Sequence, residues 1–209
     1  MTRSLYAAIL ASLILVSCTP TTRTVGSSFT DPGFRPGSVH SMVVQVKTDD
    51  LGERQALEGS AVSALTSSGT SAGRSIDLLP PTRDIGDAAS KRKIMNSGTD
   101  AVLVITPKQK KVVEEYIPPS YYPGHRRYSR YHSGYGDFYN VPGVIDGGYF
   151  IREPVATYDA TLYSLPHYRT LWTGQFTIRG STGADFNALA GRFGPELVKR
   201  MGADGILGP

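Results

Sequence analysis

The most apolar stretch of the chain after its first 18 residues is Ala-Val-Leu-Val-Ile at 101–105. A short run of this kind is typical of a strand that is covered on both faces of a sheet. Two further strands are predicted before it, at 41–47 and 73–79, and segments with helical periodicity separate the three strands. Because parallel strands need crossover connections, this β-α-β-α-β order constrains the fold more than any other feature.

The two helical segments carry boundary signals. The first helix is predicted to begin after Asp49 and Asp50, because an acid at this place is a preferred N-cap. It is predicted to end near residue 67. Glu53 falls where the acid of a capping box would lie. The second helix is predicted over 84–97. We interpret the two neighbouring aspartates as a helix cap and not as a catalytic pair.

The second half of the chain changes pattern. One strand is predicted at 110–117, a long antiparallel hairpin at 153–165 and 168–179, and a last helix at 184–201 that Gly194-Pro195 kinks or splits. The sequence therefore predicts an α/β (α+β) fold: a mixed β-sheet with helices on one or both faces. We expect a single domain over 39–209, with a Tyr/Gly-rich insert at 117–150.

Residues 1–17 are predicted to be a signal peptide. Arg3 precedes an apolar run from Leu5 to Val16, which is too short to span a bilayer as a stable helix. The run ends in Leu-Val-Ser-Cys at 15–18, which resembles the bacterial lipobox in all four positions. The resemblance implies cleavage before Cys18 and a lipid on its thiol. The alternatives are an ordinary signal peptide with a chance cysteine and an uncleaved membrane anchor.

Cys18 is the only cysteine in the 209 residues, which excludes an internal disulfide and a cysteine-based metal site. Its thiolate can be alkylated to a thioether that carries diacylglycerol, and the freed α-amino group can take a further acyl chain. Stable anchoring needs more than one chain, because each buried CH₂ contributes only about 0.8 kcal/mol. No cofactor other than this covalent lipid is expected. Thr19 stands where Asp commonly retains enteric lipoproteins in the inner membrane, so the resemblance implies the outer membrane, facing the periplasm.

Residues 18–38 are predicted to be the lipidated cysteine and a flexible tether. The segment is rich in Thr, Ser, Pro and Gly and lacks apolar periodicity. Some 20 such residues would reach about 25 Å and would lift a domain clear of the lipid headgroups. The alternative is an irregular strand that packs on the domain, with Phe29 and Phe34 as anchors.

Two further motifs are Ser-Gly-Thr-Asp-Ala-Val-Leu-Val-Ile at 97–105 and Tyr-Asp-Ala-Thr-Leu-Tyr at 158–163, the latter followed by Leu-Trp-Thr-Gly at 171–174. Together they resemble small bacterial envelope lipoproteins of unknown function, in which a Tyr/Gly-rich insert separates the two motifs. The likeness covers roughly 40–207 and describes a fold. The opening is also similar to the TolB amino-terminal domain and to the core of the curli secretion lipoprotein, which implies no function. The sequence shows no obvious strand-rich pore insertion, which argues against a channel.

The insert is the candidate binding segment. Residues 116–150 hold eight of the twelve tyrosines, and a segment of this length inside a domain is usually functional or disordered. Tyrosine gives a large rigid surface with a hydroxyl, and interleaved arginine can grip anionic polymers or stack on sugars. The candidate binding residues are Tyr121, Tyr122, His125, Arg126, Arg127, Tyr128, Arg130, Tyr131, His132 and Tyr135. The alternatives are a mobile loop without a dedicated partner and a surface for single-stranded nucleic acid, against which the export signal argues.

No catalytic motif and no metal site is predicted. His125 and His132 match no known metal-ligand spacing, and the chain has no Gly-rich phosphate loop or GxSxG elbow. The net charge of +4 does not by itself imply nucleic acid. The sequence therefore predicts a non-catalytic, lipid-anchored envelope protein that binds or scaffolds through the insert, with an envelope protein or a cell-wall polymer as its partner. The alternative is a periplasmic hydrolase of cell-envelope polymer with its site in the insert.

Overall fold

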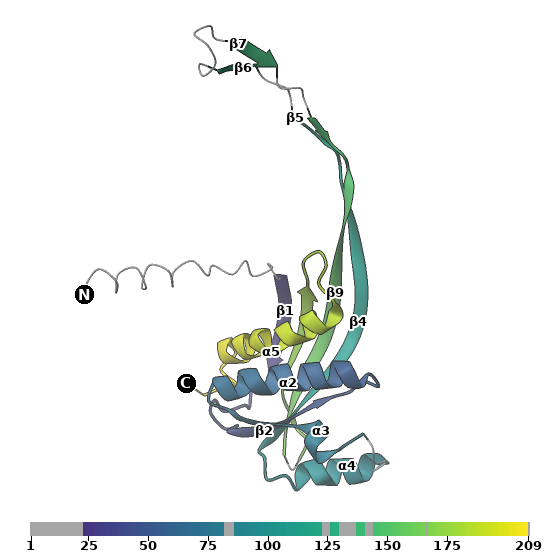
Figure 1. Ribbon diagram of the computed structural model, residues 1–209. Coiled ribbons are helices and arrows are strands. Elements are labelled where there is room, and N and C mark those ends of the chain that lie inside the picture. The colour runs from purple at the N-terminus through teal and green to yellow at the C-terminus, as the bar shows by residue number, and fades with distance from the viewer. Residues whose placement is uncertain are drawn as a thin grey trace, which may run out of the picture.

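The computed structural model describes residues 23–81, 86–122, 126–129, 137–140, 144–165 and 167–208. The main strands are β1 (Arg23–Thr30), β2 (Ser41–Val46), β3 (Ser71–Arg74), β4 (Ala101–Ile117), β9 (Tyr149–Ser164) and β10 (Thr170–Arg179). They form one six-stranded sheet in the order β1-β10-β9-β4-β2-β3 (Figure 1). β2 is parallel to β3 and β4, whereas β4, β9, β10 and β1 pair antiparallel in succession. The predicted mixed sheet and its β-α-β-α-β order are confirmed.

Helices cover both faces of the sheet. α2 (Leu51–Ser67) and α5 (Phe186–Ala203) lie on one face, and α3 (Ser75–Leu78) and α4 (Gly86–Met95) lie on the other (Figure 1). The main core is between the sheet and α2 and α5, and its largest fully buried side chains include Trp172, Tyr158, Phe176 and Phe193. A smaller cluster of Val43, Leu79, Ile94 and Val102 lies beneath α3 and α4. Trp172 is therefore a core residue, as its place in the predicted hairpin suggested.

The helix boundaries follow the predicted caps only in part. The Asp50 carboxylate accepts a hydrogen bond from the backbone N–H of Glu53 at 3.0 Å, which confirms the N-cap of α2. The capping-box role of Glu53 is wrong, because its carboxylate instead accepts from the Thr48 hydroxyl and pairs with Lys110. α5 begins at an Asp185 cap and continues past Pro195 as one helix, so it is not split.

The strand predicted at 73–79 is largely wrong. β3 ends at Arg74, and the chain turns directly into the short helix α3. The turn is fixed by the buried carboxylate of Glu58, which accepts from the Ser75 hydroxyl and from the Ile76 backbone N–H. That N–H is consequently unavailable to a neighbouring strand.

The strand predicted at 110–117 is the outer part of β4 and not a separate element. β4 and β9 pair from Ala101↔Ser164 to Ile117↔Tyr149, with one irregularity between Pro107 and Gln109. Both strands continue past the ends of the neighbouring strands as a two-stranded ribbon (Figure 1). The ribbon continues in the insert, where β5 (Ser120–Tyr122) pairs with β8 (Val144–Asp146) and β6 (Arg126–Ser129) pairs with β7 (Asp137–Asn140). The insert therefore does contain strands, contrary to the sequence-based expectation.

The boundary of the tether also needs correction. All eight residues of β1 pair with β10, from Arg23↔Arg179 to Thr30↔Trp172, so most of the predicted spacer at 18–38 belongs to the folded body. Phe34 packs against the main core, whereas Phe29 is 64% exposed and anchors nothing there. Residues 1–22, with the predicted signal peptide and Cys18, lie outside the described residues. Among the residues that are described, no helix is long and apolar enough to cross a membrane.

Candidate functional site

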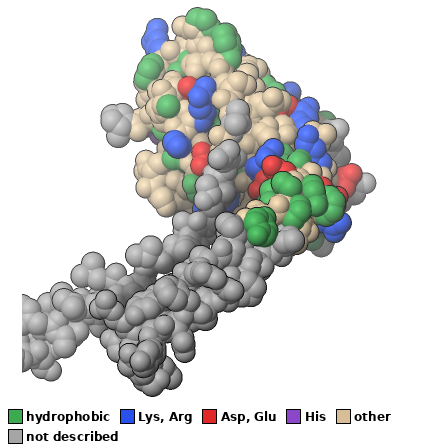
Figure 2. Space-filling model, turned by 90° about the horizontal axis from the view of Figure 1, so that it is seen from above, with side chains coloured by type: hydrophobic (Ala, Val, Ile, Leu, Met, Phe, Trp, Pro, Cys, Tyr) green, Lys and Arg blue, Asp and Glu red, His purple; other side chains and the backbone are tan. Residues whose placement is uncertain are grey.

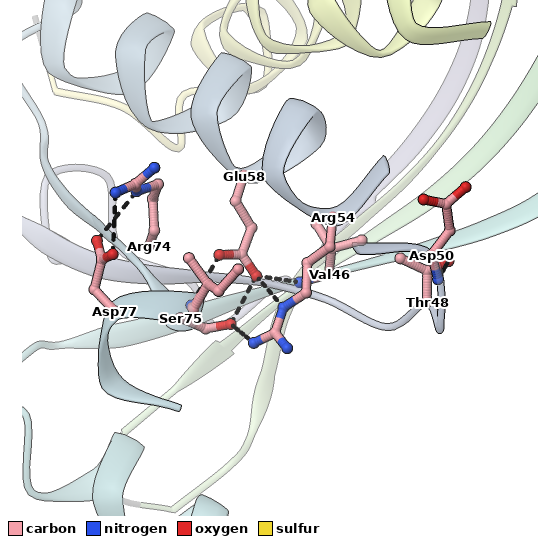
Figure 3. Close-up of polar contacts among 9 residues, drawn as sticks. Val46, Thr48, Asp50, Arg54, Glu58, Arg74, Ser75 and Asp77 are labelled. Atoms are coloured by element: carbon pink, nitrogen blue, oxygen red, sulfur yellow. Dashed lines mark hydrogen bonds and ion pairs between the residues drawn. The ribbon is translucent and has the colours of Figure 1, made fainter. Parts of the chain in front are cut away.

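A buried acid lies at the carboxyl ends of β2 and β3, where open α/β sheets usually place their ligands. Glu58 of α2 is fully buried, and its Oε1 accepts from the Val46 backbone N–H at 3.2 Å, from Arg54 Nε at 3.0 Å and from Ser75 Oγ at 2.7 Å (Figure 3). Its Oε2 accepts from the Ile76 backbone N–H at 2.9 Å. These four donors come from three separate parts of the chain.

Glu58, Arg54 and Ser75 form a cluster whose members hydrogen-bond to one another. Arg54 donates a second hydrogen bond, from Nη2 to Ser75 Oγ at 3.0 Å, so the guanidinium and the hydroxyl both serve the carboxylate (Figure 3). A buried charge is tolerated only when it is paired and hydrogen-bonded in this way. The arrangement fixes α2 to the end of β2 and to the start of α3. We interpret it as structural.

A second buried acid lies on the same face of the sheet. Glu53 is 6% exposed, and its Oε1 lies 2.9 Å from Nζ of Lys110 on β4. The Tyr158 hydroxyl nearby is buried without a hydrogen-bond partner. Burial raises the pKa of Tyr158 well above its ordinary value of 10, and the charge of Glu53 acts in the same direction. The tyrosine therefore stays protonated and cannot serve as a base near neutral pH.

Replacing Tyr158 with phenylalanine is expected to raise stability by about 1 kcal/mol near pH 7, because it removes a buried unpaired hydroxyl. With a raised folded-state pKa, the stability that comes from the neutral phenol is fully present below pH 10 and is lost as the pH rises above it. The variant should therefore show less alkaline loss than the parent. Urea denaturation at pH 8 and above pH 10 measures both effects. A Tyr158→Phe variant that is clearly less stable than the parent at pH 8 would show that the Tyr158 hydroxyl makes a stabilising hydrogen bond.

A histidine, a serine and an aspartate, the residue types of a hydrolytic triad, lie together at the amino ends of β2 and β4. Their hydrogen bonds do not connect them in the order that a triad requires. Oδ2 of Asp100 accepts from the backbone N–H groups of His40 and Ser41 at 2.9 and 3.0 Å, and from Ser41 Oγ at 3.1 Å. The backbone hydrogen bond from His40 is the main cause that holds the pKa of Asp100 below its usual range. A triad needs the imidazole between the hydroxyl and the acid. Here the acid lies between the other two, and it clips β2 to β4.

A pocket of about 400 Å³ lies between α4 and the sheet, where the sequence predicted no site. Its lining includes Lys47, Lys91, Tyr163 and Tyr168. Tyr168 has a left-handed backbone with φ of 54°, which is uncommon for a bulky residue, and Lys91 Nζ lies 4.2 Å from the centre of its ring. The cation–π contact stabilises the turn that joins β9 to β10. No sequence pattern around Tyr168 indicated this contact.

The predicted binding residues are placed on the ribbon or lie outside the described residues. Tyr121 lies on β5 and is 65% exposed. The backbone of Tyr122 also lies on β5, and the backbones of Arg126, Arg127 and Tyr128 lie on β6, opposite β7. Outside the described residues are His125, Arg130, Tyr131, His132 and Tyr135. The hydrolase alternative, which depends on the two histidines, therefore stays a prediction.

The candidate binding residues chosen from the sequence did not include the aromatic residues at the base of the insert. We define the outer ribbon as residues 112–122 and 144–154, the part of the ribbon beyond the sheet. The Tyr116 and Phe150 rings contact each other across the two strands, with centroids 5.0 Å apart, and the two residues are 53% and 64% exposed. Tyr149 is 54% exposed. Seen from above, hydrophobic side chains gather with charged ones around them on the near side of the molecule (Figure 2).

The geometry of the described residues supports an interaction surface more than a catalytic site. Among them, no three His, Cys, Asp or Glu side chains gather as a metal site. The two buried acids are held by structural partners, whereas the aromatic side chains of the outer ribbon are exposed. Exposed aromatic side chains, with Tyr116 and Phe150 on one face of the ribbon and Tyr149 on the other, are typical of an interaction surface. The outer ribbon is therefore the candidate functional site.

Comparison with protein-family models finds no match, and neither does comparison with curated protein sequences. Solved structures with a similar course of the chain include a PelC dodecamer from Paraburkholderia phytofirmans, which is 14% identical with a TM-score of 0.49 and covers 90% of this chain and 99% of that one. Another is a lipoprotein from Neisseria meningitidis, which is 15% identical with a TM-score of 0.41 and covers 78% of this chain and 98% of that one. Similarity at this level concerns the fold alone.

Proposed function

We propose that this chain is a non-catalytic, lipid-anchored protein of the bacterial cell envelope, and that its tyrosine- and arginine-rich ribbon is the element through which it binds or scaffolds. The observation that carries the proposal is the continuity of the ribbon with the two central strands of the sheet. β4 has 17 residues and β9 has 16, and one ladder, with a single irregularity between Pro107 and Gln109, joins their buried and projecting parts. A binding segment presented in this way is held by the core of the domain.

The residues of the ribbon are better suited to binding than to catalysis. Tyr121, Tyr149 and Phe150 are more than half exposed, and each offers a large surface that loses little conformational entropy on binding. The segment between them adds Arg126, Arg127 and further tyrosines to the same projecting element. Lipid on Cys18 would place this element at the outer membrane, on its periplasmic side, within reach of envelope proteins and cell-wall polymer. Nucleic acid is not expected there.

Removal of the insert tests the proposal. Ile117 and Tyr149 face each other in register, so residues 118–148 can be replaced by an Asn-Gly turn that closes the hairpin. We expect the shortened protein to keep the denaturation midpoint of the parent, because both core clusters are made of described residues outside the deleted segment. In the native envelope it should lose the crosslinked products that the full chain forms, while it remains in the membrane fraction.

The matched control keeps the ribbon and removes the anchor. A Cys18→Ala chain should fold but lose lipid labelling and membrane attachment. Unchanged crosslinking after removal of the insert would overturn the binding role of the ribbon. Persistent membrane attachment of the Cys18→Ala chain would overturn the anchor instead, so the two parts of the proposal fail independently.

A further inference from the structure

The distance between the proposed lipid and the folded body is short. Four residues, 19–22, separate Cys18 from Arg23, the first residue of β1. Five residue steps can span no more than about 18 Å even when fully extended. The body is therefore held close to the leaflet that carries the lipid, and not at the separation that a 20-residue tether would give.

The outer ribbon leaves the body at the same end as the tether. One row of paired residues runs across four strands, from Arg23 through Arg179 and Val155 to Lys111. Beyond this row β4 and β9 continue for six more pairs, from Val112↔Pro154 to Ile117↔Tyr149, which is about 20 Å at 3.3 Å per residue. Figure 1 shows the ribbon projecting past the end of the sheet at which β1 begins.

The body cannot turn this end away from the leaflet. β1 is eight residues long, or about 26 Å at 3.3 Å per residue, which exceeds the reach of the four-residue tether. The tether therefore cannot run back along β1 to present the opposite end of the sheet to the lipid. The end that holds Arg23 is therefore the part of the body nearest the lipid, and the outer ribbon leaves the body from this end.

The side chains of the outer ribbon match the chemistry of a membrane surface. Tyr116, Tyr149 and Phe150 are exposed, and amphipathic aromatic rings favour the headgroup layer. The Tyr116 ring packs over Gly148, the residue before β9, where a Cβ would meet the ring. The neighbouring Glu114–Arg152 ion pair at 2.8 Å is exposed and can remain hydrated.

We propose that the outer ribbon lies against the same lipid leaflet that anchors Cys18, with Tyr116, Tyr149 and Phe150 in its headgroup layer. The inference rests on the proposed lipid anchor and names the surface that the base of the ribbon contacts. Lipid and ribbon together make two attachments, which fix the orientation of the domain on the membrane.

Depth-dependent fluorescence quenching tests the proposal with the full lipidated chain. The parent has one tryptophan, Trp172, which is fully buried. Tyr116→Trp places a second one on the outer ribbon, and Lys93→Trp places one on α4, at the opposite end of the body in Figure 1. In phosphatidylethanolamine–phosphatidylglycerol vesicles with brominated acyl chains, the new emission of Tyr116→Trp should fall roughly twofold, and that of Lys93→Trp should stay unchanged. Phe150→Trp repeats the measurement if Tyr116→Trp disturbs the ribbon.

The outcomes separate this inference from the anchor on which it rests. Mass spectrometry that finds no lipid on Cys18 would refute the anchor itself. With the lipid present, equal emission of the ribbon and α4 tryptophans would refute the membrane contact and leave the anchor intact. Quenching that vanishes when purified cell-wall fragments are added would assign the surface to the polymer, and would likewise overturn the proposal.

Discussion

Replacement of Glu58 by alanine is expected to destabilise the protein by about 3–5 kcal/mol, the usual cost of breaking a buried ion pair. The change leaves the Arg54 guanidinium without its carboxylate, and it leaves the backbone N–H groups of Val46 and Ile76 without an acceptor. Glu58 is fully buried and Val46 is 4% exposed, so solvent replaces these lost hydrogen bonds only poorly. Urea denaturation followed by circular dichroism measures the change.

The matched control is the exposed pair of Arg74 and Asp77, which lies beside the same cluster (Figure 3). Arg74→Ala should cost only about 0.2–1 kcal/mol, because both side chains are largely hydrated. Glu58→Gln should fall between the two variants, since an amide keeps the shape but loses the charge that Arg54 needs. Equal costs for Glu58→Ala and Arg74→Ala would show that the buried carboxylate does not hold the elements together.

Replacement of Gly194 by alanine is expected to cost about 3 kcal/mol or more, or to prevent folding. α2 and α5 approach so closely here that a Cβ on Gly194 would meet the backbone carbonyl of Ser60. Two hydrogen bonds lock the approach: Ser60 Oγ donates to the Gly191 carbonyl at 2.7 Å, and the Gly194 N–H donates to Ser60 Oγ at 3.0 Å. A backbone atom cannot move aside by changing a rotamer, so the helices must separate.

Gly191, one turn earlier in α5, provides a control of opposite sign. A Cβ at Gly191 would have no neighbour within 4 Å. Gly191→Ala should therefore stabilise the protein by about 0.5–1 kcal/mol through the better helix propensity of alanine. Thermal denaturation of the two variants gives the comparison. A small or favourable effect of Gly194→Ala would contradict the close contact of the helices.

Periodicity predicted the elements that bury one continuous face. Apolar residues at helical spacing, Leu57, Ala61, Val62 and Leu65, predicted the helix that is α2, and the apolar run at 101–105 predicted the central strand. Periodicity missed β1, because five of its eight residues are Ser, Thr or Gly and it lies at the edge of the sheet, where one neighbouring strand supplies the hydrogen bonds. It missed the length of β4 because residues 108–112 are exposed and give no alternation to read.

The buried acid Glu58 and the exposed outer ribbon could be predicted from the sequence to different degrees. Glu58 occupies the apolar stripe of α2, three residues before Ala61 and seven before Leu65, which is a signal of a buried charge that needs partners. Its donors lie in three separate segments, and no local pattern brings them together. The tyrosine-rich insert was visible from composition alone, but the exposure of Phe150 and Tyr149 depends on β4 and β9 continuing beyond the sheet.

The ladder of β4 and β9, which has one irregularity between Pro107 and Gln109, joins the ribbon directly to the buried part of the sheet. A force at its outer end is carried along the paired strands, past this irregularity, to the buried pair of Leu103 and Leu162. It must either open hydrogen bonds one after another or rotate the whole sheet, together with α2 and α5 packed on it. Rotation breaks no ladder pairs, so the tilt of the rigid body should follow any displacement of the ribbon tip.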